Sequence, residues 1–317
     1  MSVVTASDRL PTAVVVTYHP PEGLAQRLRE TLAQVDRLIV VDNGSASPPS
    51  FAELPTEDTA RIERVLLPRN VGLAAALNRG IECARAGGAT RVLLLDHDST
   101  PHPAMATELL AAMRAHTRPV ALAAPRIAYA HPAIRCRWPA SRRGQRWWFR
   151  FAYAATLEQP LPVDLVIGSG MLLDVDAWAH LGGFDESLFI DLVDTEFCLR
   201  ARRQGYDVLA VPRAVLAHTL GHVEQRHLLG MPVYPTHHNA LRHYYLSRNR
   251  ILLSRRYALT FPNWFFYETM SALKLTIKVA LYEPGRGAKL ASMWRGTLDG
   301  LRGRRTAVAD AASTPGP

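Results

Sequence analysis

The sequence predicts an α/β protein with a mainly parallel central sheet, flanking helices and a helical extension near its C-terminal end. Segments with the pattern of buried strands alternate with helical segments along residues 12–116, and short turns join them. The strand segments are continuously apolar rather than alternating, which is typical of strands that helices cover on both faces. Both observations favour a layered, parallel sheet.

Four strands and three helices are expected in this first part of the chain. Each strand is an apolar run that ends in a polar turn, and the strands cover residues 12–20, 35–45, 61–68 and 91–98. The helices cover residues 22–34, 71–88 and 103–116. The first helix carries Leu24, Leu28 and Leu32 on one face, and the second ends at Gly87-Gly88.

Residues 163–222 continue the pattern with less regular segments. The segment "VIGSGMLLD" at 166–174 is expected to be a strand that Gly168-Ser169-Gly170 interrupts, where a ligand can approach the backbone closely. The segment "VDAWAHLGGFDESL" at 175–188 is expected to form a short helix and a turn. The segment "DTEFCLRARRQG" at 194–205 is expected to form an amphipathic helix with Asp194 at its N-cap.

Polar side chains follow four of the predicted strands. They are Tyr18-His19, Asp42-Asn43, Arg69-Asn70 and Asp96-His97-Asp98. The carboxyl ends of parallel strands meet at one edge of a sheet, and ligands of such sheets bind at that edge. Each group taken singly is also compatible with an ordinary polar turn, so the convergence of all four carries the prediction of a ligand site.

The turns lack the two common phosphate-binding loops. The first turn is not a G-x-G-x-x-G sequence, and the chain contains no G-x-x-x-x-G-K-[ST] segment. Nicotinamide-dependent hydride transfer and P-loop nucleotide hydrolysis are therefore disfavoured.

The segment "LLLDHDST" at 93–100 brings two carboxylates to the same side of a strand end, because residues two apart in a strand point in the same direction. Proteins hold Mg²⁺ with one or two carboxylates together with substrate phosphates. Asp96 and Asp98 are thus candidates for holding a metal that bridges the protein to a diphosphate. In the alternative interpretation they are solvated turn residues, and Asp98 caps the helix that follows Pro101.

The ordered segments resemble family 2 glycosyltransferases of the GT-A fold, and more narrowly the bacterial dTDP-rhamnosyltransferases. The matching segments are "VDNGS" at 41–45, "RNVGLAAALNRGI" at 69–81, "LLLDHDS" at 93–99, "GSGMLLD" at 168–174, "GGFDESLFIDLVDTEFCLRARRQGY" at 182–206, "HTLGH" at 218–222 and "LRHYYLSRNRILL" at 241–253. Two details differ from the family's pattern. The usual Glu-Asp before the helix is Val193-Asp194 here, and the middle residue of Asp-x-Asp is His97.

The resemblance implies an inverting transferase that moves a sugar, with L-rhamnose from dTDP-rhamnose as the first expectation, to a saccharide acceptor of cell-surface polysaccharide synthesis. It implies that Asp194 is the catalytic base and that Asp98, supported by Asp96, holds Mg²⁺ or Mn²⁺ on the leaving diphosphate. His218 matches a family position near the diphosphate, either as a third metal ligand or as a structural histidine. The implied donor-binding residues are Thr17, Tyr18, Asp42, Asn43, Arg69, Asn70, Asp96, Gly168 and Ser169. Asp96 is therefore a candidate for two contacts, one with the metal ion and one with the ribose of the nucleotide donor.

Two other functions stay open on the sequence. Another GT-A transferase, using a different UDP-, dTDP- or GDP-sugar, would carry the same motifs, because the shape of the pocket decides the choice of sugar. A non-catalytic polysaccharide-binding scaffold on a degenerate copy of the fold is less favoured. Such a copy is expected to lose Asp98 or Asp194, and both are present.

The formal net charge is +9, but the composition argues against a nucleic-acid partner. Lysine occurs only at residues 274, 278 and 289, and the arginines are spread along the chain. The three cysteines at 83, 136 and 198 lie far apart and indicate reduced thiols. No signal peptide is evident, and no apolar run reaches the roughly 18 residues of a membrane span. We therefore expect a cytoplasmic protein, either free or peripheral on the inner face of the plasma membrane.

We expect a catalytic domain over residues 1–256, a helical extension over 257–305 and a disordered tail over 306–317. The extension mixes aromatic and apolar residues with lysine and arginine, as do helices that lie on a membrane surface. The alternative is packing on the catalytic domain or on a second copy in a homodimer. The segment "WWF" at 147–149 follows a basic run and is a candidate for stacking on the acceptor, or else for a hydrophobic anchor.

Overall fold

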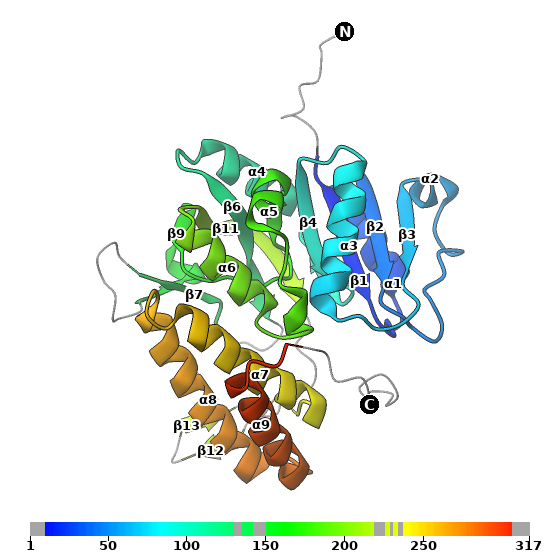
Figure 1. Ribbon diagram of the computed structural model, residues 1–317. Helices are drawn as coiled ribbons and strands as arrows, with labels where there is room; N and C mark the ends of the chain where they lie inside the picture. The colour runs from blue at the N-terminus through cyan, green and yellow to red at the C-terminus, as the bar shows by residue number, and fades with distance from the viewer. Residues whose placement is uncertain are drawn as a thin grey trace.

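A computed structural model describes residues 10–129, 135–141, 150–218, 226–228, 231–233 and 237–305. The aromatic segment 147–149 and the predicted disordered tail lie outside these residues. Figure 1 shows an α/β part that contains the central sheet, and three C-terminal helices, coloured yellow to red, that gather together beside it.

In the described part of the chain the central sheet has nine strands. Their order is β3-β2-β1-β4-β10-β6-β11-β5, and β9 also pairs with β11. The strands are β1 (Thr12–Thr17), β2 (Arg37–Asp42), β3 (Ile62–Leu66), β4 (Arg91–Asp96), β5 (Ser99–Pro101), β6 (Val120–Tyr129), β9 (Leu161–Val163), β10 (Leu172–Asp174) and β11 (Asp207–His218). Two separate hairpins pair β7 (Arg137–Ala140) with β8 (Arg150–Tyr153), and β12 (Arg226–Leu228) with β13 (Met231–Val233).

The direction of the strands confirms the prediction of a mainly parallel sheet. β1, β2, β3 and β4 are mutually parallel, and β6 is parallel to β11. β10 runs antiparallel to both of its neighbours, β4 and β6. The short strands β5 and β9 are antiparallel to β11.

Helices cover both faces of the sheet, as its continuously apolar strands predict. The helices are α1 (Leu24–Leu32), α2 (Thr56–Thr59), α3 (Leu73–Ala86), α4 (Met105–Ala115), α5 (Val175–Leu181), α6 (Val193–Arg203), α7 (Ala240–Tyr257), α8 (Pro262–Tyr282) and α9 (Arg286–Leu301), with single 3₁₀ turns η2 (Ala154–Thr156) and η3 (Glu186–Leu188). Alternate residues of β1 join two separate cores. Val14 and Val16 pack in the core that contains α3, α5 and α6, while Ala13 and Val15 pack in the core that contains α1 and α4.

The predicted strand at 166–174 is shorter than expected. Only Leu172–Asp174 are strand, and the residues before them are irregular. Gly170 causes the break, since its φ of +80° is left-handed and a Cβ there would lie 2.6 Å from Pro125 Cγ. The irregular segment leads the chain across the carboxyl end of β4, where the backbone N–H of Gly170 donates to the carbonyl of Leu94 at 2.8 Å.

The three C-terminal helices pack against one another, and α7 and α8 also contribute residues to the main core. Gly296 of α9 lies so close to α7 that a Cβ there would be 2.2 Å from the carbonyl oxygen of Tyr244. Trp264 of α8 is 1% exposed and belongs to the core that contains α6. Within the described residues, every helix falls short of the length and apolar character that a membrane crossing requires.

Candidate functional site

The predicted ligand edge of the sheet contains a cavity of about 520 Å³. It lies beyond the carboxyl ends of β1, β2 and β4, and segments 167–171 and 189–194 form much of its remaining wall. The predicted residues that line it are Tyr18, Asn43, Asn70, Asp96, Asp98, Gly168, Ser169 and Asp194. The four strand ends thus converge on one cavity, and which of these residues contact a ligand stays a prediction.

Three predicted donor residues, Thr17, Asp42 and Arg69, do not line the cavity. Thr17 and Asp42 are buried, and Thr17 Oγ1 donates a 3.0 Å hydrogen bond to Asp42 Oδ1. Asp42 also accepts bonds from the backbone N–H of Ser45 at 2.9 Å and from its hydroxyl at 2.6 Å. Asp42 therefore fixes the turn after β2, while Arg69 is exposed. Their contact with a donor stays a prediction.

Two asparagines of the cavity wall hold the turns after β2 and β3 together. Asn43 Nδ2 donates to Asn70 Oδ1 at 3.0 Å, and Asn43 Oδ1 accepts from the backbone N–H of Val71 at 2.9 Å. Asn70 Oδ1 also accepts from the backbone N–H of Gly72 at 2.9 Å. These amides therefore have a structural role as well as a position in the cavity.

Gly72 is required by the contact between the start of α3 and the segment 189–192. Its φ is +92°, and a Cβ there would lie 2.6 Å from Phe189 Cδ2 and 2.8 Å from the Phe189 carbonyl oxygen. That carbonyl accepts a 2.6 Å hydrogen bond from the backbone N–H of Leu73. It thereby satisfies one of the free N–H groups at the start of the helix.

Buried hydroxyls hold the turn that carries Asp96 and Asp98. The backbone N–H of Asp96 donates to Ser169 Oγ at 3.3 Å, and Ser169 Oγ lies 2.9 Å from Ser99 Oγ. The Arg27 guanidinium donates to the main-chain carbonyl between the two aspartates at 2.7 Å. The N-cap residue of α4 is Ala104, so the alternative in which Asp98 caps this helix is wrong.

The donor atoms at this turn fit a hard divalent cation. Asp96 and Asp98 both line the cavity, and Mg²⁺ and Mn²⁺ prefer carboxylate oxygens. Among the described residues, no cluster of three His, Cys, Asp or Glu side chains could hold a metal ion. His218 belongs to β11, but its side chain lies outside the description. The residues present therefore suit a cation that takes part of its coordination from the protein and the rest from a bound diphosphate.

Asp194 lies in the first turn of α6 and not at its N-cap, so that detail of the prediction is wrong. The N-cap is Leu192, with a φ of 60° and no side-chain cap. The free N–H groups of a helix extend over its whole first turn, so an acidic residue alone does not mark the capping position. The carboxylate accepts hydrogen bonds from the backbone N–H groups of Gly168 at 2.9 Å and Thr195 at 2.7 Å.

The pKa of the Asp194 carboxyl is raised above its ordinary value of 3.8. Burial is the largest cause, because removal from water disfavours the charged form. The two backbone N–H groups oppose this effect, while the nearby charges of Asp191 and Asp96 raise the pKa further. A carboxyl with a raised pKa is a better match for a base that accepts a hydroxyl proton near neutral pH.

The segment before Asp194 has a strained backbone that α7 holds in place. Phe189, Asp191 and Leu192 have φ angles of 65°, 63° and 60°, in a region that residues other than glycine rarely adopt. Asn249 Nδ2 donates to the carbonyls of residues 188, 190 and 191 at 2.9, 2.8 and 3.0 Å. Arg248 donates to the carbonyls of residues 187 and 188 at 2.6 and 3.2 Å. These side chains of α7 therefore determine the course of the cavity wall.

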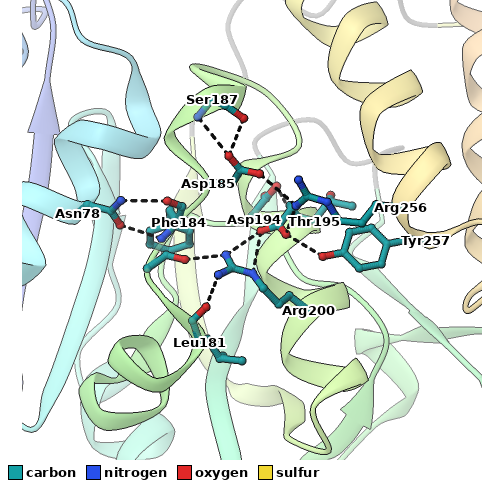
Figure 2. A network of polar contacts seen from close by, with 12 residues as sticks. Asn78, Leu181, Phe184, Asp185, Ser187, Asp194, Thr195, Arg200, Arg256 and Tyr257 are labelled. Carbon is teal, nitrogen blue, oxygen red and sulfur yellow. Dashed lines mark hydrogen bonds and ion pairs between the residues drawn. The ribbon is translucent and has the colours of Figure 1, made fainter. Parts of the chain in front are cut away.

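A second network fixes α6 through the fully buried carboxylate of Glu196. Glu196 Oε2 accepts from Arg200 at 2.7 Å, and Oε1 accepts from Arg256 at 2.9 Å and from the Tyr257 hydroxyl at 2.7 Å. Arg256 also bonds to Asp185 at 3.0 Å, and Figure 2 shows Arg256 and Tyr257 reaching this region from α7. Burial, with the nearby charge of Glu196, raises the pKa of Tyr257 to about 12, so this hydroxyl keeps its proton and donates.

Sequence reasoning missed two charged residues of the cavity wall, Asp191 and Arg242. Arg242 Nε donates to both oxygens of Asp191 at 3.1 and 3.2 Å, and Nη2 donates to Oδ1 at 3.0 Å. Both residues lie in segments that carry the resemblance to family 2 glycosyltransferases, and this position was the available sign that they belong to the site. Among the residues that the structure describes, the charged side chains that line the cavity, histidine apart, are then four carboxylates and one guanidinium: Asp96, Asp98, Asp191, Asp194 and Arg242.

Comparison with known proteins identifies a matching family model and a sequence relative. A model described as glycosyl transferase family 2 matches residues 12–182. The dTDP-rhamnosyl transferase RfbF of Shigella flexneri is 27% identical over 298 residues, which are 92% of this chain and 95% of the relative.

One solved structure shares the fold at low identity, and a second is a weaker match. The crystal structure of GalNAc-T7 with UDP, GalNAc and Mn²⁺ matches 82% of this chain with a TM-score of 0.55 at 14% identity. The matched part is 51% of GalNAc-T7, so this chain spans about half of that protein. The crystal structure of S. aureus TarS matches 66% of this chain and 36% of its own, with a TM-score of 0.47 at 15% identity.

Proposed function

The chain belongs to glycosyl transferase family 2 and is a glycosyltransferase, and we propose that it transfers L-rhamnose from dTDP-rhamnose to a saccharide acceptor with inversion. One observation carries the choice of donor. The similarity to a dTDP-rhamnosyl transferase extends over 95% of that relative, and so includes both the cavity and the C-terminal helices. The proposed acceptor is a growing cell-surface saccharide, free or carried on a lipid.

We assign the role of general base to Asp194. The support is its position in the cavity wall, its raised pKa and the two backbone N–H groups that fix its orientation. In a single displacement the acceptor oxygen bonds to the anomeric carbon while its proton passes to Asp194. The bond from that carbon to the diphosphate breaks on the opposite side, and the configuration inverts.

The charge of the cavity supports a requirement for a divalent cation. In the described part of the chain four carboxylates and one guanidinium line it, and a nucleoside diphosphate adds further negative charge. Asp98 and Asp96 would hold Mg²⁺ or Mn²⁺, which when bound supplies positive charge to the leaving diphosphate. Arg242 is the one arginine or lysine among the described residues that line the cavity, and it already pairs with Asp191, so it offsets only part of the repulsion.

The donor is tested by calorimetric titration and product analysis with dTDP-rhamnose, a UDP-sugar and a GDP-sugar, each with and without Mg²⁺. We expect binding and transfer with dTDP-rhamnose in the presence of Mg²⁺. Transfer from a UDP- or GDP-sugar instead would agree with the assignment as a glycosyltransferase but would overturn the proposed donor. Binding of every nucleotide sugar without any transfer to saccharides would favour the scaffold alternative.

The metal role is tested with Asp98→Ala. Loss of one carboxylate should weaken Mg²⁺-dependent donor binding by at least about tenfold, while the melting temperature should change little because Asp98 lies in a solvent-accessible turn. Asp176→Asn, which alters an exposed carboxylate of α5 outside the cavity, is the matched control. Donor affinity that is indifferent both to EDTA and to Asp98→Ala would exclude the proposed metal site.

A further inference from the structure

Helix α8 carries apolar side chains on two opposite faces. Trp264, Leu275 and Val279 are buried against the rest of the protein. The residues of the opposite face, called here the α8 stripe, are 37–54% exposed: Phe266, Met270, Leu273, Ile277 and Leu281. Their spacing of three and four residues aligns them on one side of the helix over about four turns. A contiguous apolar surface of this kind on a folded protein indicates a contact site.

The acidic side chains of residues 258–305 are all buried. The structure describes this whole segment, and Glu268, Glu283 and Asp299 are its three carboxylates. Glu268 and Glu283 form ion pairs with basic residues at 2.7 and 2.8 Å. Asp299 accepts a 3.0 Å hydrogen bond from the hydroxyl of Tyr244. The outer surface of the segment therefore presents no exposed carboxylate.

The exposed charges of the same segment are all positive. They belong to Lys274, Arg286, Arg295, Arg302, Arg304 and Arg305. Lys274 follows Leu273 directly and so stands at the border of the α8 stripe. An amphipathic helix with an apolar face and basic neighbours is the arrangement that binds along an anionic membrane surface.

We infer that the α8 stripe, with Lys274 at its border, forms a docking face for an anionic lipid surface, and that the other exposed basic side chains of this segment add to the attraction. The stripe would enter the boundary between headgroups and acyl chains, and the lysine and arginine side chains would contact lipid phosphates. A second copy of this chain is a poorer occupant, because pairing through the same face would bring like-charged basic side chains together with no exposed carboxylate of this segment to offset them.

Packing connects this docking face to the cavity. α9 follows α8 and contacts α7 closely at Gly296 and Gly300, where a Cβ would lie 2.2 and 2.7 Å from carbonyl oxygens of α7. α7 in turn contributes Arg242 to the cavity wall. Docking would thus hold the cavity in a set orientation to the lipid surface, as a lipid-carried acceptor requires. Only this last step depends on the proposed function, since lipid binding itself needs no transfer.

The test is flotation of the full chain with vesicles of phosphatidylcholine alone and of phosphatidylcholine with phosphatidylglycerol. We expect flotation with the anionic vesicles and a loss of it at high salt. Leu273→Ser and Lys274→Glu should each reduce the bound fraction, the second by roughly tenfold because an attraction becomes a repulsion. Both variants should keep the wild-type melting temperature and the wild-type rate with a soluble acceptor, because the changed side chains are exposed.

Two controls separate this inference from the proposed transfer reaction. Leu66→Ser changes a 53% exposed leucine on β3, a strand at one end of the central sheet, and should float like the wild type. Asp194→Asn should float equally well although transfer is lost. If the active wild-type protein does not float with anionic vesicles, the proposed docking face is wrong, whereas the proposed transfer reaction is unaffected. A dimer in sedimentation that Leu273→Ser dissociates would assign the stripe to a subunit contact and also overturn the inference.

Discussion

Replacement of Asp194 by asparagine separates the proton-accepting role of this side chain from its role in the fold. The carboxylate accepts one hydrogen bond from Gly168 and one from Thr195. A carboxamide has one acceptor oxygen, so one of these bonds is lost at a cost of about 1 kcal/mol. The substitution also removes a partly buried charge that Asp191 and Asp96 repel, which stabilises the variant at neutral pH. The two effects oppose each other, so the net change in unfolding free energy should stay within roughly 1 kcal/mol.

The effect on transfer should be much larger than the effect on stability. Removal of a general base lowers the rate by about 10²–10⁴-fold, which corresponds to roughly 3–5 kcal/mol in the activation barrier. Asparagine cannot take the proton of the acceptor hydroxyl, whereas donor binding does not require that transfer. We therefore expect kcat to fall while the dissociation constant of the donor stays within roughly threefold of the wild type.

The pH dependence gives an independent readout of the same carboxyl. A raised pKa means that the folded protein binds the proton at a higher pH than the unfolded chain does. The contribution of Asp194 to stability is therefore greatest below its ordinary pKa of 3.8 and is lost as the pH rises through the raised value. The variant should gain unfolding free energy relative to the wild type as the pH rises through this window. The acid limb of the wild-type rate profile should be absent from its residual activity.

The assays are steady-state transfer to a soluble acceptor, calorimetric titration of the donor, and urea unfolding at several pH values. Asp176→Asn, outside the cavity, should match the wild type in all three. A kcat of Asp194→Asn near the wild-type value would refute the assignment of the base. If Asp191→Asn lost the rate instead, the base would be Asp191, the neighbouring carboxylate of the same cavity wall.

Three substitutions test the structures that support the site. Asn249→Leu should lower the unfolding free energy by about 2–4 kcal/mol and also lower kcat, because three carbonyls before Asp194 lose their donor; unchanged urea unfolding would contradict this. Gly72→Ala should lower the free energy of thermal unfolding by about 2–3 kcal/mol. Gly88→Ala is its control, because Gly88 also has a positive φ, +82°, but no atom lies near the position of its Cβ. This control should lower the unfolding free energy by only about 1 kcal/mol, the strain of the backbone angle. Glu196→Gln should lower the unfolding free energy by about 3–5 kcal/mol, because it removes the charge that pairs with Arg200 and Arg256 in a buried setting. A melting temperature within roughly 2 °C of the wild-type value would contradict that reasoning.

The sheet and the edge that holds the cavity could be predicted because both depend on local patterns. Residues of β1 alternate between two cores, so a strand that is apolar at every position signals burial on both faces. The carboxyl ends of parallel strands meet wherever such strands are neighbours, so Tyr18, Asn43, Asn70 and Asp96 could be assigned to one edge before their order in the sheet was known.

The other wall of the cavity could not be predicted, because it depends on contacts between distant segments. Asp191 and Arg242 are 51 residues apart in the chain and meet because α7 packs beside the segment that precedes α6. Phe189, Asp191 and Leu192 adopt positive φ angles, but none of them is a glycine or an asparagine, the residues that would indicate such a conformation in the sequence. The same segment misleads a prediction of the helix start, since Asp194 has the chemistry of a cap while the chain enters α6 at Leu192.

The strained wall also explains how the C-terminal helices support the site independently of any lipid contact. Each left-handed residue of the wall costs about 1–3 kcal/mol, and such strain persists only where neighbouring structure holds it. Here Asn249 and Arg248 of α7 hold it through the carbonyls of residues 187–191. α7 is held in turn by α9, because a side chain at Gly296 or Gly300 would collide with its backbone. The position of the proposed base therefore depends on residues about 50 and 100 positions later in the chain, and a substitution that loosens α9 should lower kcat before it unfolds the sheet.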